Sequence, residues 1–455
     1  MGAPDPGHAS RRGRARALPG APLSAPVELS ERLDALLRRA RWLGLLAALV
    51  VLGVLLARVI RHPESGDTRF YRFGAERLAQ GQPLYFLDPP GVSDYRNGTG
   101  YTYLPPFALL SEWMRWLSYP SVRVVWLLLM ALALVGVALG LARLARPPPR
   151  AWLAGALTAL ICARFVLNDL AHGQVNALLT LLLLAALLGA RGEAGWPRWT
   201  AGVALGLALT IKPTSWLLVP WLLLERRWRV VSAALLTGLA LLGLSALRYP
   251  APLLPQIGEW LTLMPRFAAE CVVPHNASLA ATLSRGLAFS GASSSLLPGR
   301  LLAGALVLAG LVLSWRARDP ERPERGWAAV LILSALFSPV TWKAHLVVLL
   351  IPAWLIARDL SVAPSRARAL TLALALACFL LPSRGVAGLG GLERLGALSL
   401  GLVLLWALLL SGPPEPEHPA PGDEVPGGSQ LAPGQAAPLG VEAAAGEGTA
   451  AQEQA

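Results

Sequence analysis

The hydrophobic positions of this chain gather into long runs instead of the one-sided patterns of a soluble domain. Leu, Ala and Gly dominate these runs, and spanning a bilayer takes about 20 mostly apolar residues. Strands of a membrane barrel would instead alternate apolar and polar residues. Because a helix satisfies its own backbone hydrogen bonds in lipid, the pattern predicts an all-α polytopic membrane protein.

The spacing of these runs predicts about twelve transmembrane helices. They cover residues 42–60, 122–144, 152–167, 175–190, 200–211, 216–224, 230–247, 297–315, 327–337, 346–357, 369–381 and 392–410. Arginine clusters lie in alternate turns, and such clusters favour the cytoplasmic side. Residues 200–211 and 216–224 are each too short to cross alone. We therefore expect them to form a shallow hairpin shielded by other helices.

The polar segments divide the chain into three expected parts. Residues 1–41 form a basic, largely disordered cytoplasmic segment, 42–410 the membrane domain, and 411–455 a disordered cytoplasmic tail of Pro, Gly, Ala and Glu. Within the membrane domain, residues 61–120 and 248–296 are expected to be long outer loops. Residues 104–117 are apolar but carry Glu112 and Arg115, which predicts a helix on the outer surface instead of a span.

The amino-acid composition and the net charge further restrict the class of protein and its expected partners. Only 15% of the residues are charged, against about 25% in a soluble domain. The net charge of +13 resides largely in arginine clusters between hydrophobic helices, so we expect membrane lipids as partners and no nucleic acid. Three cysteines, Cys162, Cys271 and Cys378, make neither a disulfide framework nor a metal-binding spacing. No cofactor is expected, and residues 42–60 are too long for a secretory signal.

Unusual polar residues all fall at helix edges on the expected extracytoplasmic side, whereas the cytoplasmic turns carry mainly arginine. These polar residues are Asp67, Asn168, Asp169, His172, Gln174, Asn176, Lys212, Asn276, Trp342, Lys343 and His345. Polar groups at membrane depth are costly and mark a site or a water-filled cavity. The sequence therefore predicts a catalytic pocket that faces away from the cytoplasm of a plasma (inner) membrane protein.

Asp67, about one turn beyond the first expected span, is the candidate catalytic group. A carboxylate there could take the proton of an acceptor hydroxyl. The alternative is a helix-capping or solvated aspartate.

The other candidates each have a structural alternative. Lys212 could bind a phosphate as a point charge or snorkel to the interface, and His345 could donate to a phosphate or act as an acid. Gln174 and Asn176 could hydrogen-bond a ligand or cap a turn. Tyr71, Tyr103 and neighbouring tyrosines could stack on a sugar or mark the membrane interface. Asn276–Ser278 also fits a weak glycan-acceptor triplet.

Motifs for nucleotide substrates and for a serine nucleophile are absent from the sequence. The chain has no P-loop, no Rossmann glycine pattern, no G-x-S-x-G and no Asp-x-Asp. A nucleotide-sugar donor held through a metal ion therefore has no support in the sequence.

Taken in order, the short motifs resemble those of glycosyltransferase family 87, the polyprenyl-phosphate-mannose-dependent α-mannosyltransferases, also described as DUF2029. The matching motifs are D-x-x-x-Y at Asp67–Tyr71, A-x-x-x-x-x-G-x-x-x-Y at Ala75–Tyr85, Y-x-P-P-F at Tyr103–Phe107, G-Q-x-N at Gly173–Asn176, K-P at Lys212–Pro213, N-x-S at Asn276–Ser278 and S-P-x-x-W-x-x-H at Ser338–His345. The set runs from about Asp67 to Pro352. The chain has Ala344–His345 where the family often has two histidines, and Lys343 could compensate.

The resemblance implies a GT-C fold, a polyprenyl-phosphate sugar as donor, and a lipid or glycan as acceptor. It implies that Asp67 is the base and that His345 and Lys212 contact the donor phosphate. Gln174, Asn176, Asn276, Tyr71, Tyr103 and Trp342 would bind substrate. A single carboxylate favours direct, inverting displacement. Mannose is the expected hexose, with glucose, arabinose and galactose as alternatives.

Two other classes of protein stay open from the sequence. A flippase or transporter of lipid-linked sugars would need broken helices and polar groups near the midplane, and only the hairpin around Lys212 suits it. A non-catalytic partner in cell-envelope synthesis would not need the cluster of polar residues.

Overall fold

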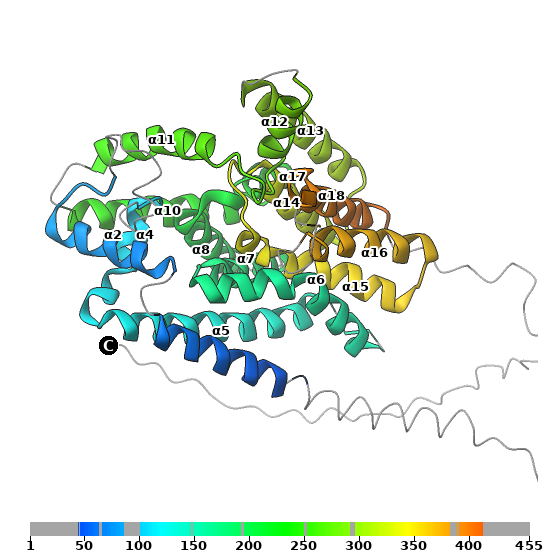
Figure 1. Cartoon of the computed structure of the whole chain (residues 1–455), viewed down its shortest axis with the longest axis horizontal. Coiled ribbons are helices and arrows are strands. Elements are labelled where there is room, and N and C mark those ends of the chain that lie inside the picture. The colour runs from blue at the N-terminus through cyan, green and yellow to red at the C-terminus, as the bar shows by residue number, and fades with distance from the viewer. Residues whose placement is uncertain are drawn as a thin grey trace, which may run out of the picture. The chain divides into compact units, whose positions relative to one another are not determined.

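The computed structural model describes residues 44, 46–62, 66–85, 101–145, 147–148, 150–192, 195–249, 253–291, 296–382, 389 and 391–412. All of them belong to one unit, Met1–Pro413. Within these ranges every regular element is a helix, which confirms the all-α prediction (Figure 1). The predicted segment 1–41 and nearly all of the predicted tail 411–455 lie outside the described residues.

Five described helical stretches are long and apolar enough to cross a membrane. They are α5 (Tyr119–Leu144), α6 (Ala151–His172), α10 (Trp228–Arg248), α13 (Leu296–Arg316) and the stretch Lys343–Val362, which joins η3 (Lys343–Leu349) to α15 (Leu350–Val362). Residues 46–60 of the first expected span are also helical. The predicted total of about twelve spans stays a prediction.

Several predicted spans form shorter helices. These are α7 (Asn176–Arg191), α8 (Gly195–Ile211), α9 (Leu218–Leu224), α14 (Pro323–Phe337), α16 (Arg366–Leu380) and α18 (Ala397–Leu410). The seven residues of α9 extend only about 10 Å at 1.5 Å per residue, so α9 cannot cross alone. The predicted helix 392–410 is split into α17 (Gly391–Arg394) and α18, because Gly396 has a φ of +83°.

The centre of the unit explains how short helices are accommodated. Nearly every residue of α14 and α15 is buried, including residues on all sides of both helices. A helix that is apolar all round belongs in an interior, and here longer helices such as α5, α10 and α13 leave many large apolar side chains exposed. The apolar faces of the long helices are suited to lipid, while α14 and α15 form a protein core.

The two predicted outer loops contain helices of their own. In the first lie α2 (Thr68–Gln80), α4 (Pro105–Leu110) and η1 (Glu112–Trp116), so the apolar stretch 104–117 is two short helical pieces and not a span. In the second lie α11 (Leu253–Glu270) and α12 (Leu279–Phe289). In Figure 1, α11 lies near α2 and α4. The Trp260 indole donates to Thr102 O at 2.9 Å, which joins the two segments.

Glycines bring α8 against α10 at close range. A Cβ at Gly202 would lie 2.5 Å from Val230 O, and a Cβ at Gly206 would lie 2.6 Å from Ala234 O. Small residues allow such backbone approach between membrane helices. The contact fixes α8, and the end of α8 carries Lys212.

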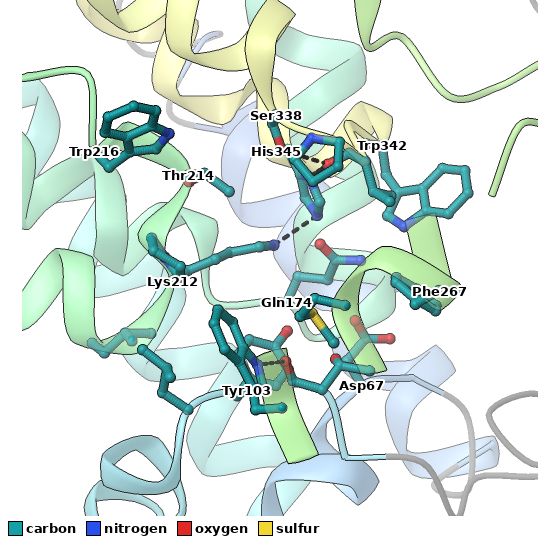
Figure 2. Close-up of a pocket in the computed structure, with 18 of the residues that line it drawn as sticks. Asp67, Tyr103, Gln174, Lys212, Thr214, Trp216, Phe267, Ser338, Trp342 and His345 are labelled. Atoms are coloured by element: carbon teal, nitrogen blue, oxygen red, sulfur yellow. Dashed lines mark hydrogen bonds between the residues drawn. The ribbon is translucent and has the colours of Figure 1, made fainter. Parts of the chain in front are cut away.

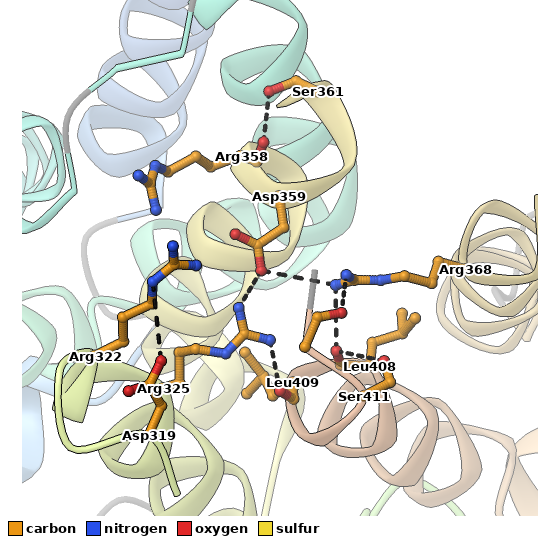
Figure 3. A network of polar contacts seen from close by, with 11 residues as sticks. Asp319, Arg322, Arg325, Arg358, Asp359, Ser361, Arg368, Leu408, Leu409 and Ser411 are labelled. Atoms are coloured by element: carbon orange, nitrogen blue, oxygen red, sulfur yellow. Dashed lines mark hydrogen bonds and ion pairs between the residues drawn. The ribbon is translucent and has the colours of Figure 1, made fainter. Parts of the chain in front are cut away.

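A buried ionic cluster joins α14, α15, α16 and α18 at the far end of the stretch that begins with Lys343 (Figure 3). The Asp359 carboxylate accepts from Arg325 and lies 3.7 Å from Arg368 Nη2. Arg325 also donates to Leu409 O at 2.7 Å, and Arg368 donates to Leu408 O at 3.3 Å. The cluster thereby satisfies carbonyls at the end of α18 that have no partner within the helix.

Candidate active site

A cavity of about 310 Å³ lies where α2, α4, α8, α11 and the segment before α15 meet. Its polar lining comes from distant parts of the chain and includes Asp67, Tyr103, Gln174, Lys212, Thr214, Ser338, Trp342 and His345 (Figure 2). Six of the nine candidate site residues from the sequence are in this set. The volume is in the range of small-molecule sites, about 300–1,000 Å³.

Asp67 stands at the position before the first turn of α2, but its side chain does not cap the helix. Its carboxylate is partly buried and lines the cavity. Its backbone N–H donates to His172 O at 2.7 Å, which fixes the start of α2 to the end of α6. The capping alternative is therefore excluded by the geometry, and the carboxylate is available to the cavity.

Two glycines and one arginine make this junction possible. Gly66 and Gly173 have φ values of +102° and +63°, and a Cβ on Gly66 would lie 2.4 Å from His172 O. Arg123 is only 2% exposed. Its Nη1 donates to Thr68 Oγ1 at 3.4 Å and occupies the space that a Cβ on Gly173 would need. Sequence analysis missed Arg123, since within a predicted span it was one arginine among many.

Lys212 and His345 meet at the opposite wall of the cavity (Figure 2). Lys212 Nζ lies 2.6 Å from His345 Nε2 and donates to Asn176 Oδ1 at 3.3 Å. His345 Nδ1 lies 3.2 Å from Val340 O, a group that can only accept. Because the Lys212 ammonium can only donate, Nε2 accepts from it and Nδ1 carries the proton toward Val340 O, while the Trp342 backbone N–H makes a longer contact of 3.4 Å with Nδ1. The imidazole thus aims the lysine into the cavity.

Behind the lysine lies a buried network of side chains. Asn176 Nδ2 donates to Asp169 Oδ1 at 2.9 Å and to Gln174 Oε1 at 2.8 Å. The Asp169 carboxylate also accepts from the backbone N–H groups of Asn176 and Ala177, each at 3.2 Å. An acidic group at a helix N-terminus is favourable, and this one orients both amides. Gln174 lines the cavity, whereas Asn176 lies behind it and holds Lys212.

Asn276 does not line the cavity but holds one of its walls. It is fully buried. Its Oδ1 accepts from the N–H groups of Ser278 and Thr341, each at 2.9 Å, and its Nδ2 donates to Cys271 O and Pro339 O. These bonds join the segment before α12 to the segment that leads to Trp342 and His345. A side chain so enclosed is inaccessible as a glycan acceptor.

The tyrosines divide into one that lines the cavity and several that support it. Tyr103 lines the cavity, and its hydroxyl lies 3.3 Å from that of Tyr71. Tyr71 is fully buried and packs edge-on against Tyr103 and Phe107, with ring centroids 5.2 and 5.0 Å apart. Tyr101 is also buried, against Gly74. Tyr71 therefore fixes Tyr103 and does not itself reach the cavity.

Three cavity residues on α11 were missed by sequence analysis: Trp260, Met264 and Phe267. Their spacing of i, i+4 and i+7 is the signature of one apolar helix face. It could have been found, had residues 248–296 been examined for helical periodicity.

A second missed signal is the choice of cation. Lys212 and Lys343 are the two lysines of the whole chain, although Lys and Arg together number 40. Both lie at the edge of this cavity or the next one. Lysine is a compact point charge whose protonation shifts readily on burial, and arginine is neither. The exception to arginine use therefore marks the site.

Burial and nearby charges shift the pKa values of Asp67 and Lys212, which lie outside the candidate spans. Burial raises the pKa of Asp67, against the opposing charges of Lys212, His172, Arg123 and Arg69. Burial lowers the pKa of Lys212 to about 8, and the negative charges of Asp67 and Asp169 oppose this shift. Both shifts bring the groups closer to neutral pH, where a general base and a titratable cation work best.

An apolar groove of about 400 Å³ continues from the cavity between α11, α12 and α13. The two spaces share Met264, Phe337 and Pro339. Apart from Arg300 and Ser284 the groove lining is apolar. In the described part of the chain, no group of three or more His, Cys, Asp or Glu side chains is placed to hold a metal ion. The site thus combines a carboxylate, an amine and an imidazole with an adjoining apolar groove.

Comparisons with known proteins identify a family of glycosyltransferases that resembles this chain. The sequence profile of glycosyltransferase family 87 matches residues 101–340. A Mycobacterium tuberculosis protein named polyprenol-phosphate-mannose-dependent alpha-(1-2)-phosphatidylinositol mannoside mannosyltransferase is 30% identical over 340 residues, 68% of this chain and 74% of the relative. A pentamannoside mannosyltransferase of Mycolicibacterium smegmatis, named as dependent on the same donor, is 29% identical over 307 residues, 65% of this chain and 70% of the relative. No solved structure matches the chain.

The apolar helices and the matched family together define a multi-pass membrane glycosyltransferase. The chain belongs to glycosyltransferase family 87. This confirms the resemblance and the prediction of an enzyme, and gives no support to a transporter. The GT-C arrangement stays a prediction.

Proposed function

We propose that this enzyme transfers a hexose, most simply mannose, from a polyprenyl-phosphate sugar to a hydroxyl of a lipid or glycan acceptor at the extracytoplasmic face of the plasma membrane. The observation that carries the proposal is one cavity that contains Asp67, Lys212 and His345. Relatives are named for a polyprenol-phosphate-mannose donor and mannoside lipid acceptors.

In the proposed reaction Asp67 accepts the proton of the acceptor hydroxyl as the oxygen attacks the anomeric carbon of the donor. The new C–O bond forms as the bond from that carbon to the phosphate oxygen breaks, and polyprenyl phosphate leaves with the bonding electrons. A single carboxylate at the cavity fits direct displacement with inversion, because retention through a covalent intermediate uses a second one as nucleophile.

Lys212 and His345 form the proposed phosphate end of the cavity. The donor phosphodiester carries one negative charge, and the departing phosphate monoester carries more. A positioned cation therefore stabilises the transition state more than it stabilises the bound donor in its ground state. This difference is the requirement for catalysis. The His345 imidazole and the Asn176 amide hold Lys212 for this role. Gln174, Tyr103 and Trp342 are proposed to contact the sugar.

The apolar groove supports a lipid-linked donor. Its lining would suit the first isoprene units of the carrier, and it joins the cavity through shared residues. The extracytoplasmic side is proposed because arginine clusters occupy the other ends of the predicted spans.

The test is reconstitution of the purified protein with polyprenyl-phosphate mannose and a short-chain alkyl α-mannoside, followed by mass analysis of the products. Asp67→Asn should lower turnover by at least about a hundredfold, as expected for loss of a general base. Its melting temperature should not change, because Asp67 makes no cap. Asp319→Asn, which alters an exposed carboxylate paired with Arg322, is the matched control.

Full activity in Asp67→Asn would remove Asp67 as the base. A panel of polyprenyl-phosphate glucose, galactose and arabinose identifies the sugar. If no polyprenyl-phosphate sugar is consumed, the donor class is wrong.

A further inference from the structure

A second cavity, of about 400 Å³, adjoins the first and differs from it in chemistry. Its own lining is polar throughout: Asn168, His172, His275, Lys343 and Glu393. Gln174 and Trp342 form a wall that it shares with the central cavity. The central cavity thus has an apolar neighbour on one side and a polar neighbour on another.

The lysine of the polar cavity has its counter-ion within the cavity wall. Lys343 Nζ lies 2.5 Å from Glu393 Oε1, and the same carboxylate accepts from Arg164 at 2.9 Å. His172 Nδ1 lies 2.8 Å from Asn168 O and donates its proton to that carbonyl. A cavity of mixed donors and acceptors, in which the lysine is already paired with a carboxylate, suits the hydroxyls of a sugar better than it suits a phosphate.

Aromatic rings at the shared wall point the same way. The His275 and Trp342 rings are stacked with centroids 5.0 Å apart and an angle of 29° between their planes. Large amphipathic rings offer an apolar face together with a polar edge. Trp342 lines both cavities, so a sugar that packs against this pair would lie beside the boundary.

The backbone connects this cavity to Asp67. His172 O accepts the N–H of Asp67, and the His172 side chain lines the polar cavity. Asp67 and His172 are therefore joined at the backbone, and their side chains line the central and the polar cavity, respectively. Glu393 belongs to α17, the short helix created by the break at Gly396, and this break gives the polar cavity one of its walls.

We propose that the polar cavity binds the uncharged sugar end of the acceptor, with the hydroxyl to be glycosylated directed past Gln174 and Trp342 toward Asp67. The proposal rests on the proposed function and assigns the two substrates to different cavities. The donor phosphate and lipid occupy the central cavity and the apolar groove, and the acceptor glycan enters from the polar side.

The test compares His275→Ala and Lys343→Gln with the wild-type enzyme in a full kinetic matrix of polyprenyl-phosphate mannose and octyl α-mannoside. Each variant should raise the KM for octyl mannoside about tenfold, as expected for loss of one or two ligand contacts. The KM for the donor should stay unchanged, as should slow donor hydrolysis without acceptor. His62→Ala, a change of an exposed histidine outside the cavity, is the matched control.

An unchanged acceptor KM in both variants, or a raised donor KM instead, would overturn the assignment. If His275→Ala fails to fold, Lys343→Gln decides alone, and its melting temperature is measured alongside. If the wild-type enzyme cleaves no donor at all, the failure is that of the proposed function. If the donor is hydrolysed normally but the variants leave acceptor affinity intact, only the acceptor site is wrong.

Discussion

The charge of the Lys212 side chain depends on its burial in the cavity wall. Its amine is fixed by His345 and Asn176 and faces Asp67 across the cavity. Burial disfavours the charged form, which lowers its pKa to about 8. The ammonium is therefore present at neutral pH in the free enzyme and is lost as the pH rises through that value.

We expect the alkaline limb of kcat/KM for the donor to lie near pH 8, because this parameter reports the titration of the enzyme form that binds the donor. Lys212→Arg should keep partial activity and move that limb upward, since guanidinium does not titrate in this range. Lys212→Gln should lose activity at every pH. Lys343→Arg is the control and should leave the limb in place. A limb unmoved in Lys212→Arg would assign it to another group.

The acid limb belongs to Asp67. Burial raises the pKa of its carboxyl, so the base is lost at a higher pH than an ordinary aspartate would be. We therefore expect an acid limb above the usual range of a carboxylate.

The convergence of Asp67, Lys212 and His345 could be predicted from the sequence because each follows a helix end on the same expected side. Asn276 and Tyr71 were expected in the cavity for the same reason, yet they hold its walls. The position of a residue along the chain predicts on which side of the membrane it lies. Only the packing of the helices determines which side chains line the cavity. Arg123 was beyond prediction, since its place depends on two glycines from separate segments.

At the scale of elements, α8 positions the site through its contact with α10. The glycines of α8 lie against backbone oxygens of α10, and Lys212 follows directly after the last residue of α8. The sequence predicted the hairpin 200–224 but not its proportions. α8 begins at Gly195, whereas α9 has only about two turns, because the 3₁₀ turn Pro213–Ser215 takes up residues of the predicted hairpin.

We expect Gly206→Ala to destabilise the protein by about 1–3 kcal/mol, the cost of overpacking an interface, and to lower activity by displacing Lys212. Gly243→Ala on α10 is the matched control, because a Cβ there meets nothing within 4 Å. Melting temperatures of the two purified variants in detergent, with initial rates, make the comparison. Equal stability of both variants would show that the α8–α10 contact can relax.

At the scale of the whole molecule, the distribution of helices was predictable and the internal organisation was not. Hydrophobic runs located nearly every helix, because burial in lipid and burial in protein both require apolar residues. The same rule cannot tell α14 and α15, enclosed by protein, from α5 and α13, which expose large apolar side chains. Single polar residues scattered along residues 253–270 likewise hid α11, since a helix that covers a cavity needs one apolar face only.

The predicted orientation can be tested across α13. Ser290 and Ala317 are exposed positions that flank this candidate span. The native cysteines Cys162, Cys271 and Cys378 are buried, so background labelling should be low. In intact cells a membrane-impermeant maleimide should label Ser290→Cys, and it should label Ala317→Cys only after permeabilisation. The reverse pattern would place the site on the cytoplasmic side.

The shared wall of Gln174 and Trp342 has a consequence for the order in which the substrates arrive. With the polar compartment empty, solvent has a path through it to an activated sugar seated beside Asp67. A carrier-bound sugar that reacted with solvent would be wasted. We therefore expect ordered binding of the two substrates. The acceptor glycan binds first and excludes water from the polar cavity, and the polyprenyl-phosphate sugar then enters from the bilayer.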